Sequence, residues 1–312
     1  MKKILCFGDI CPDLLIPYGT AKTPHSEKED QLVHFRHGGS VANTASGLGR
    51  LGVPVLFAGT AGDDYFGRQL KAGLEEDNVD TRCMRLEKGR MTVQILIVVD
   101  ANRERTPFAF PPSGASQHQI LPEQVPLSLL EEVGWMHASG ITLREEPAAA
   151  TQLMLMEACK KRGIPLSLDI NARPESRSDS TFSRYLQKAL PLCDVLLGSL
   201  EEELCPLAGE TDPEKAVEKL LKQVPMVVAR RGGNSALLYT REERYEAPVT
   251  PVIVEDSVGA GDAYNAGFLS ALWEGLSPEA ANRRGVLCGT VCVTRPGARS
   301  CPTREELDGL RQ

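Results

Sequence analysis

The sequence predicts an α/β fold in which helices flank a mostly parallel sheet and a smaller β-sheet is added to it. Short β-branched or apolar runs alternate along the 312 residues with longer amphipathic segments, a pattern typical of repeated strand-helix units. Two stretches, 14–37 and 91–110, interrupt this alternation with strand-like and turn-like residues. We expect them to form a small second sheet.

The elements of the main body follow in chain order. Strands are predicted at 4–7, 55–59, 135–139, 165–169, 195–197 and 226–229. A helix is predicted over 151–162, where Gly163 supplies a C-terminal stop. Another is predicted over 212–222, where Asp212 caps the first turn and Pro213 occupies it.

The composition excludes two large classes of partner. Lys and Arg number 35 against 42 Asp and Glu, so the net charge is −7 and the pI is near 5.4. This is the wrong sign for a protein that neutralises nucleic-acid phosphates. No apolar run approaches the roughly 18 residues that a membrane span requires. Nine scattered cysteines without a Cys-x-x-Cys pair predict reduced packing residues in a cytoplasmic protein.

The strongest functional signal lies in the glycine-rich segment 256–268. Its glycines permit a sharp turn, and a helix is predicted to continue from Asp262. The amides of Gly259, Ala260 and Gly261 then lie at a helix N-terminus, where unpaired donors and the helix dipole favour a phosphate. Asp262 in the first turn suits a proton acceptor for an attacking hydroxyl. From the local pattern alone, a cap and a plain turn explain these residues equally well.

A second glycine-rich segment lies near the N-terminus. Gly38 and Gly39 follow an extended run and open a predicted helix, so a ligand can approach their backbone closely. Asn43 lies one turn into that helix on the same side. The letters Gly-x-Gly-x-x-Gly at 47–52 match a dinucleotide fingerprint, but these glycines end a helix where the fingerprint must open one. The chain contains no P-loop either.

Taken together, the two segments resemble the signatures of the ribokinase-like (PfkB) carbohydrate kinase family. The resemblance rests on Gly38-Gly39-x-x-x-Asn43 and on Asp256-Ser-x-Gly-Ala-Gly-Asp262, and it covers essentially the whole chain. Segments 59–67 and 293–298 are similar to further turns of the family. The resemblance implies one kinase domain over 1–312, a three-layer α/β/α sandwich with a β-sheet lid near 14–37 and 91–110.

The resemblance also implies roles for single residues. Asp262 matches the catalytic base, and the amides of the preceding turn match the anion hole for the transferred phosphoryl group. Asp13 matches the acidic residue that binds sugar hydroxyls, and the glycine pair 38–39 with Asn43 completes that contact. For Asp9, a turn at the strand end is the preferred interpretation.

A magnesium site is implied at the segment that begins with Ser199. Ser199-Leu-Glu-Glu202 stands where the family has Asn-x-x-Glu, which is associated with magnesium and phosphate positioning. Serine replaces the asparagine here, so Glu202, acting through water, is the stronger candidate for holding Mg²⁺. A solvated helix start over 201–203 is the alternative interpretation.

The nucleotide side of the expected site draws on two loops. Arg231 and Gly232 resemble the family's nucleotide loop, and Ser257 is assigned to the same side. Asp256 and the loop 294–300 correspond to a monovalent-cation site known in several relatives, so K⁺ is a candidate cofactor beside ATP and Mg²⁺.

The acceptor side is suggested by residues 169–173. Asp169-Ile-Asn171-Ala-Arg173 resembles a strand end in fructokinase-like and 2-keto-3-deoxygluconate kinase-like members. The planar fork of Arg173 suits a carboxylate or a pair of polyol hydroxyls, with Asn171 beside it. A surface arginine is the alternative interpretation.

The expected function is ATP-dependent phosphorylation of a hydroxyl of a sugar, sugar acid or related polyol. A nucleoside kinase of the same superfamily and a non-catalytic sugar- or nucleotide-sensing protein with the same fold are the alternatives. The partners are a small sugar-type acceptor and ATP, with no nucleic acid and no membrane. The alternating segments at 31–36 and 93–99 need cover for an apolar face, which predicts a homodimer through the lid.

Overall fold

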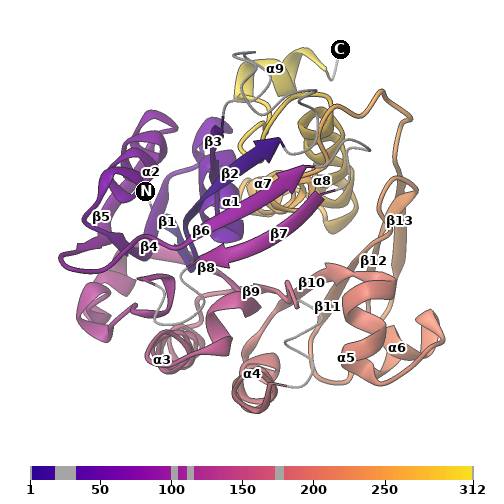
Figure 1. The fold of residues 1–312 in the computed structure, drawn as a ribbon. Coiled ribbons are helices and arrows are strands. Elements are labelled where there is room, and N and C mark those ends of the chain that lie inside the picture. Colours follow the sequence, from indigo (N-terminus) through magenta and orange to yellow (C-terminus); the bar gives the residue numbers. More distant parts are fainter. Residues whose placement is uncertain (1, 18–32, 100–104, 111–115, 173–178, 311–312) are drawn as a thin grey trace.

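The fold contains two separate β-sheets (Figure 1). The structure, a computed structural model, describes residues 2–17, 33–99, 105–110, 116–172 and 179–310. Within them, the larger sheet has nine strands in the spatial order β13 (Arg244–Pro248), β12 (Ser235–Thr240), β11 (Met226–Arg230), β10 (Val195–Ser199), β9 (Leu166–Asp169), β8 (Val133–Ser139), β1 (Lys3–Phe7), β4 (Val55–Gly62) and β5 (Val79–Glu87). Every neighbouring pair is parallel except β11–β12 and β12–β13. The prediction of a mostly parallel sheet is confirmed.

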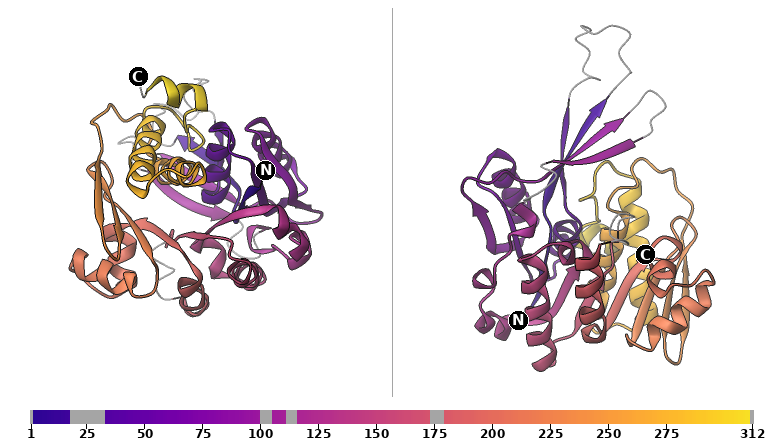
Figure 2. Two further views of the ribbon diagram at one scale, coloured as in Figure 1. Left: turned by 180° about the vertical axis from the view of Figure 1, so that it is seen from behind. Right: turned by 60° about the horizontal axis from the view of Figure 1, so that its bottom comes forward.

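Helices cover both faces of this sheet (Figures 1 and 2). One face packs against α3 (Ala148–Lys161), α4 (Ser180–Ala189), α5 (Cys205–Ala208) and α6 (Pro213–Leu221). The other packs against α1 (Ser40–Arg50), α2 (Tyr65–Glu76), α7 (Ala260–Trp273), α8 (Pro278–Val293) and α9 (Arg304–Gly309). Short 3₁₀ turns lie at Ser116–His118, Pro122–Gln124, Leu127–Glu132, Gly140–Arg144 and Leu190–Leu192, and a π-helical turn at Leu200–Leu204.

Strand β1 shows why the sequence produces this arrangement. Leu5 and Phe7 enter the hydrophobic cluster on one face, whereas Ile4 and Cys6 enter the cluster on the other, and all four side chains are fully buried. Successive side chains of a strand point to opposite faces, so an uninterrupted apolar run requires cover on both. The three layers predicted for the body follow from this requirement.

The second sheet has four strands within the described residues. Their order is β3 (His34–Gly38), β2 (Cys11–Pro17), β6 (Gln94–Val99) and β7 (Arg105–Phe110). The right-hand view of Figure 2 shows these strands standing away from the nine-stranded sheet. We call this four-stranded sheet the lid. It confirms the expected small sheet, although its strands begin at Cys11, three residues before the predicted segment.

The observed elements also differ from the predicted ones. All six predicted strands are present, but β4 extends to Gly62 and β10 to Ser199. Strands β5, β12 and β13 were not among the six. Charged residues interrupt the apolar pattern of β5 and β13, whereas β12 was missed although Ala236–Tyr239 is an uninterrupted apolar run. No helix among the described residues has both the length and the apolar character that crossing a membrane demands.

Candidate active site

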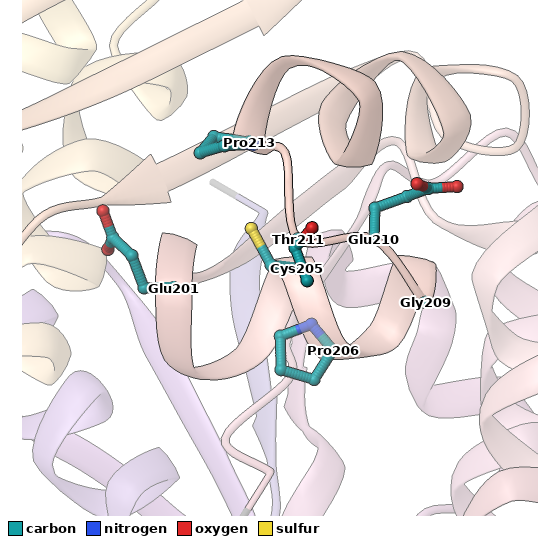
Figure 3. Close-up of a pocket in the computed structure, with 7 residues that line it drawn as sticks. All are labelled: Glu201, Cys205, Pro206, Gly209, Glu210, Thr211 and Pro213. Carbon is teal, nitrogen blue, oxygen red and sulfur yellow. The ribbon is translucent and has the colours of Figure 1, made fainter.

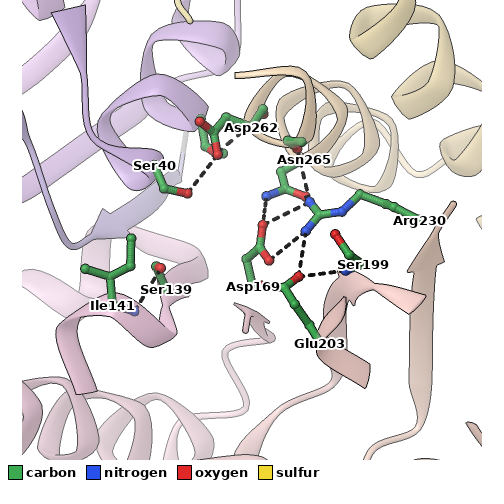
Figure 4. Close-up of polar contacts among 11 residues, drawn as sticks. Ser40, Ser139, Ile141, Asp169, Ser199, Glu203, Arg230, Asp262 and Asn265 are labelled. Carbon is green, nitrogen blue, oxygen red and sulfur yellow. Dashed lines mark hydrogen bonds and ion pairs between the residues drawn. The ribbon is translucent and has the colours of Figure 1, made fainter. Parts of the chain in front are cut away.

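Two helix N-termini from opposite ends of the chain meet at one carboxylate. α1 begins at Ser40 and α7 at Ala260, and Asp262 lies in the first turn of α7. The Asp262 carboxylate accepts a hydrogen bond from Ser40 Oγ at 2.7 Å (Figure 4). It accepts another from Asn43 Nδ2 at 2.9 Å. The fold therefore brings the two predicted glycine motifs together.

Both helices start at a glycine that no other residue can replace without strain. Gly39 and Gly259 are the N-caps of α1 and α7, with φ of 91° and 81°. A Cβ at Gly39 would lie 2.8 Å from Asp9 O, and a Cβ at Gly259 would lie 2.4 Å from Ala298 O. The glycines are thus required by backbone conformation and by close approach.

Asp9 serves the start of α1. Its side chain is 3% exposed and accepts hydrogen bonds from the amides of Ser40 at 2.7 Å and Val41 at 3.3 Å. Such a carboxylate satisfies the open donors of a helix N-terminus and complements its dipole. This contact agrees with the interpretation of Asp9 as a structural residue at a strand end.

The N-terminus of α7 presents amides toward the site. The helix begins at Ala260, two residues before its predicted start, because only Gly259 adopts the turn conformation. Its first i→i−4 hydrogen bond runs from Ala263 N to Gly259 O at 2.8 Å, so the Gly261 amide precedes that ladder. Ala260 N lies 3.4 Å from Ser257 O, which is a long and weak bond. This open helix end suits an anion.

The electrostatics of Asp262 favour proton exchange near neutral pH. Desolvation raises the pKa of Asp262 to about 7, and the negative charges of Asp169 and Asp9 act in the same direction. The hydrogen bonds from Asn43 and Ser40 oppose this shift of the pKa but come from neutral groups. A carboxylate with such a pKa can accept and release a proton near pH 7.

A buried carboxylate, Asp169, lies nearby in a charged network (Figure 4). Arg230 donates to both Asp169 oxygens at 2.9 Å, and Asn265 Nδ2 donates to Asp169 Oδ2 at 2.6 Å. Arg230 Nη1 also donates to Asn265 Oδ1 at 2.9 Å and to Gly261 O at 3.3 Å. Glu203 Oε2 lies 3.8 Å from Arg230 Nη2. The network ties β9 and β11 to the first turns of α7.

The charged groups of this network shift the pKa values of its two carboxyl groups in opposite directions. Although burial favours its neutral form, the Arg230 guanidinium holds the pKa of Asp169 below its usual value. Burial and the Asp169 charge raise the pKa of Glu203, and Arg230 acts against that rise. Arg230 and Glu203 were absent from the predicted site, because nothing in their local sequence distinguishes them from other charged residues near a strand end.

The predicted acceptor residues converge beside Asp262. A Cβ at Gly38 would lie 2.8 Å from Asp13 Oδ2, so the carboxylate of Asp13 on β2 covers the backbone of Gly38. Asn43 joins this group to Asp262 through its amide. Arg299, which was not predicted, donates through Nε to Asn43 Oδ1 at 3.4 Å and through Nη2 to Gly38 O at 3.5 Å. Desolvation lowers the pKa of Arg299 to about 10.

The stretch 169–173 is only partly described. Asp169 opens this stretch, and its carboxylate accepts hydrogen bonds from Arg230 and Asn265. Asn171 follows β9 with a φ of 43°, a left-handed conformation that Asn tolerates better than most residues. Arg173 lies outside the described residues.

The segment 199–203, where magnesium is predicted to bind, contains two exposed glutamates and one buried glutamate. β10 ends at Ser199, and Glu202 lies exposed on the π-helical turn that follows. Glu203 is buried and accepts a hydrogen bond from Ser199 N at 2.7 Å. An exposed carboxylate fits Mg²⁺, which keeps several waters and shares its remaining positions with substrate phosphates. Among the described residues, no cluster of three or more His, Cys, Asp or Glu side chains is placed to hold a metal without such help.

The predicted nucleotide residues occupy two neighbouring loops. Arg231 and Gly232 form the tight turn between β11 and β12, in which Arg231 N donates to Ser235 O at 2.8 Å and Gly232 has a φ of 56°. A Cβ at Gly232 would meet no atom within 4 Å, so this turn borders open space. Ser257 lies exposed just before the N-cap of α7.

Asp256 connects three parts of the molecule. Its carboxylate accepts hydrogen bonds from Val258 N and Gly297 N, each at 3.2 Å. It also forms an ion pair with the Arg36 guanidinium of the lid strand β3. The expected approach of Asp256 to the loop 294–300 is thus present, but a protein cation occupies the carboxylate.

One cavity lies beside the π-helical turn, away from the site residues described above. It has a volume of about 450 Å³ beside the π-helical turn and α5, and Figure 3 shows its lining of Glu201, Cys205, Pro206, Gly209, Glu210, Thr211 and Pro213. None of the predicted site residues that the structure describes is part of this lining.

Comparison with known proteins agrees with this geometry. A model of the pfkB family of carbohydrate kinases matches residues 1–305. The chain belongs to this family. A fructokinase from Klebsiella pneumoniae is 32% identical to this kinase over 98% of each chain. A 5-dehydro-2-deoxygluconokinase from Geobacillus thermodenitrificans strain NG80-2 is 23% identical over 99% of this chain and 92% of its own.

Solved structures confirm the predicted ribokinase-like fold. A putative ribokinase II from E. coli in complex with ATP and Mg²⁺ superimposes with a TM-score of 0.88 at 23% identity, covering 100% of this kinase and 99% of that chain. A fructokinase double mutant from Vibrio cholerae O395, bound to fructose, ADP and potassium, gives a TM-score of 0.82 at 24% identity over 100% and 99% of the chains.

Proposed function

We propose that this kinase transfers the γ-phosphoryl group of ATP to a hydroxyl of a ketose, a sugar acid or a related polyol. The observation that carries the proposal is the Asp262 carboxylate, placed in the first turn of α7 and held by Ser40 and Asn43. A base with a pKa of about 7 beside a helix N-terminus meets both requirements of phosphoryl transfer to an alcohol.

In the proposed reaction Asp262 accepts the proton of the attacking hydroxyl. The turn 259–261 directs amide donors at the phosphoryl oxygens, where negative charge must be balanced. Magnesium would be held through water by Glu202, and it would neutralise the charge of the nucleotide phosphates. Ser199, Arg231, Gly232 and Ser257 are proposed to border the nucleotide.

The acceptor is proposed to lie between Asp13, the glycine pair 38–39 and Asn43. Asn171 and Arg173 remain proposed contacts on the opposite side. The lid would close over the acceptor and exclude water, which otherwise hydrolyses ATP. We treat residues 1–312 as one kinase domain, because the two glycine motifs from its opposite ends form one site.

Two broader proposals accompany this function. The lid edge strand β7 exposes Phe108 and Phe110, at 53% and 45%, which supports a homodimer through the lid. All nine cysteines are buried free thiols, which supports a reducing, cytoplasmic location.

An acceptor panel tests the function. ADP release is measured with ATP and Mg²⁺ and with D-fructose, 2-keto-3-deoxygluconate, 5-dehydro-2-deoxygluconate, ribose or a set of nucleosides as acceptor. We expect turnover with fructose or a keto sugar acid, since relatives named for these acceptors match over almost the whole chain. Turnover with nucleosides alone would replace the sugar assignment, and binding without turnover for every acceptor would support a sensing protein.

A further inference from the structure

We infer that Arg36 is a built-in cation for Asp256, that it joins the lid to the loop before α7, and that it makes this kinase independent of monovalent cations. The inference rests on the proposed kinase function and concerns the same site. Arg36 lies on the lid strand β3, and its guanidinium forms an ion pair with an Asp256 carboxylate oxygen that is 220 residues away in sequence.

The surroundings of Asp256 explain why a cation is needed there. Its side chain is only 3% exposed, and it accepts hydrogen bonds from the neutral amides of Val258 and Gly297. A buried carboxylate is costly unless a positive charge compensates it. The Arg36 side chain, 30% exposed, reaches in from the lid and supplies that charge.

Asp256 also holds the glycine-rich turn 257–261 that precedes Asp262. Its carboxylate joins Val258, directly before Gly259, to Gly297 in the opposing loop. A Cβ at Gly259 would lie 2.4 Å from Ala298 O, so the two loops are packed without spare room. Any change in the charge at Asp256 should therefore shift the amides proposed as the anion hole.

The backbone of Arg36 lies beside Asp13, a residue proposed to bind the acceptor. Arg36 on β3 is paired with Asp13 on β2 in the antiparallel ladder. Residues of both strands and of both loops line one small cavity, of about 10 Å³, that includes Asp13, Arg36, Asp256 and Gly297. This is about the space of a single water molecule. The Arg36 guanidinium therefore links the position of the lid to that of the loop before α7.

The donor set does not fit a monovalent metal ion at Asp256. The resemblance of the sequence implied such a site, and a related fructokinase was solved with bound potassium. Here the carboxylate faces an arginine and two amide N–H groups, which are hydrogen-bond donors, whereas a metal ion needs oxygen lone pairs. The guanidinium already supplies the positive charge that a metal ion would bring to this carboxylate.

The test compares wild type with Arg36→Met in buffers whose monovalent cation is potassium, sodium or choline. Wild-type kcat should be the same in all three within about twofold. Arg36→Met should lose about tenfold or more, as expected when one partner of a buried ion pair is removed. Potassium or added guanidinium ion should restore part of that loss. Arg36→Lys, which keeps the charge, should lie between the two proteins.

The matched control is Arg68→Met. Arg68 forms a 2.7 Å hydrogen-bonded ion pair with Asp63 but lies exposed at the start of α2. The kcat of the Arg68→Met protein and the response of that kcat to potassium should equal those of wild type. A kcat for Arg36→Met equal to that of wild type, or a wild type that requires potassium for turnover, would overturn the inference.

A measurement without turnover keeps this inference separate from the proposed function. The melting temperature of wild type should be equal in potassium and in choline, whereas that of Arg36→Met should be lower and should rise with potassium. A potassium-dependent melting temperature of wild type contradicts the inference even when no acceptor has been found. Absence of turnover with an unchanged melting temperature contradicts only the proposed function.

Discussion

Two carboxylates of the same site, the buried Asp169 and the half-buried Asp262, have pKa values shifted in opposite directions. Asp169 is held by the Arg230 guanidinium and by Asn265, and its pKa lies below the usual value. Asp262 is held by Ser40 and Asn43, and its pKa is raised to about 7. Both have two or more hydrogen-bond donors. The charge of the partner, and not the number of hydrogen bonds, separates them.

The difference shows how the partners of two identical side chains in one site give them different roles. Asp169 stays ionised and, through Arg230, connects β9 to β11 and to the carbonyl of Gly261. Asp262, one residue further along, remains able to exchange a proton. Asn265 lies one turn beyond Asp262 on α7, so the ion pair fixes the helix that carries the proposed base.

The largest expected effect is the loss of turnover in Asp262→Asn. The amide keeps the size of the side chain but cannot accept the proton, so kcat should fall by about 10²–10⁴. The affinities for ATP and for the acceptor should change little, as measured by fluorescence titration. Steady-state ADP release at pH 8 provides kcat. A loss below about tenfold would remove Asp262 from the role of base.

The second effect concerns Asp169 through its partner. Arg230→Met leaves a buried carboxylate without its charge partner, and the free energy of unfolding should fall by about 3–5 kcal/mol. Urea unfolding followed by circular dichroism measures this change. The double variant Arg230→Met/Asp169→Leu should recover much of the stability, because no unpaired charge remains. Equal losses in the single and double variants would show that packing, and not charge, carries the contribution.

The sequence predicts those residues of the site whose role is set by their immediate neighbours in the chain. Gly39, Gly259 and Asp262 were found because a turn followed by a helix leaves a short signature in consecutive residues. Even there the start of α7 was placed two residues late, since the sequence does not show which residue of the turn leaves the helical conformation.

The other residues of the site are brought together by contacts between segments that are distant in sequence. Arg230 meets Asp169 across 61 residues, and Arg36 meets Asp256 across 220, so neither pair has a local pattern. Glu203 lies next to the predicted Glu202, but only the π-helical turn decides which of the two is buried. The packing of the sheet and helices determines which charged residues pair. Composition and periodicity do not predict these pairs.

The smallest predicted effect is a pH dependence of the free energy of unfolding, to which the two carboxylates contribute with opposite signs. The pKa of Asp262 in the folded protein, about 7, lies above the value of about 3.9 expected for the unfolded chain. The folded state therefore binds the proton more tightly, and ionisation of Asp262 lowers the free energy of unfolding as pH rises from about 4 to about 7. Above that range the loss is constant. The depressed pKa of Asp169 gives the opposite sign, since its ion pair stabilises the fold at high pH and is lost in acid.

Asp262→Asn should consequently be more stable than wild type at pH 8, by about 1–3 kcal/mol, even though it is inactive. The gain should shrink at pH 5, because Asp262 of folded wild type is then almost fully protonated. Asp169→Asn provides the matched control, because the same chemical change should destabilise the protein at pH 8. Urea unfolding of the three proteins at both pH values decides the matter. A gain for Asp262→Asn that is absent at pH 8, or equal at the two pH values, would show that Asp262 is ionised without cost and that the two carboxylates do not differ in the way proposed.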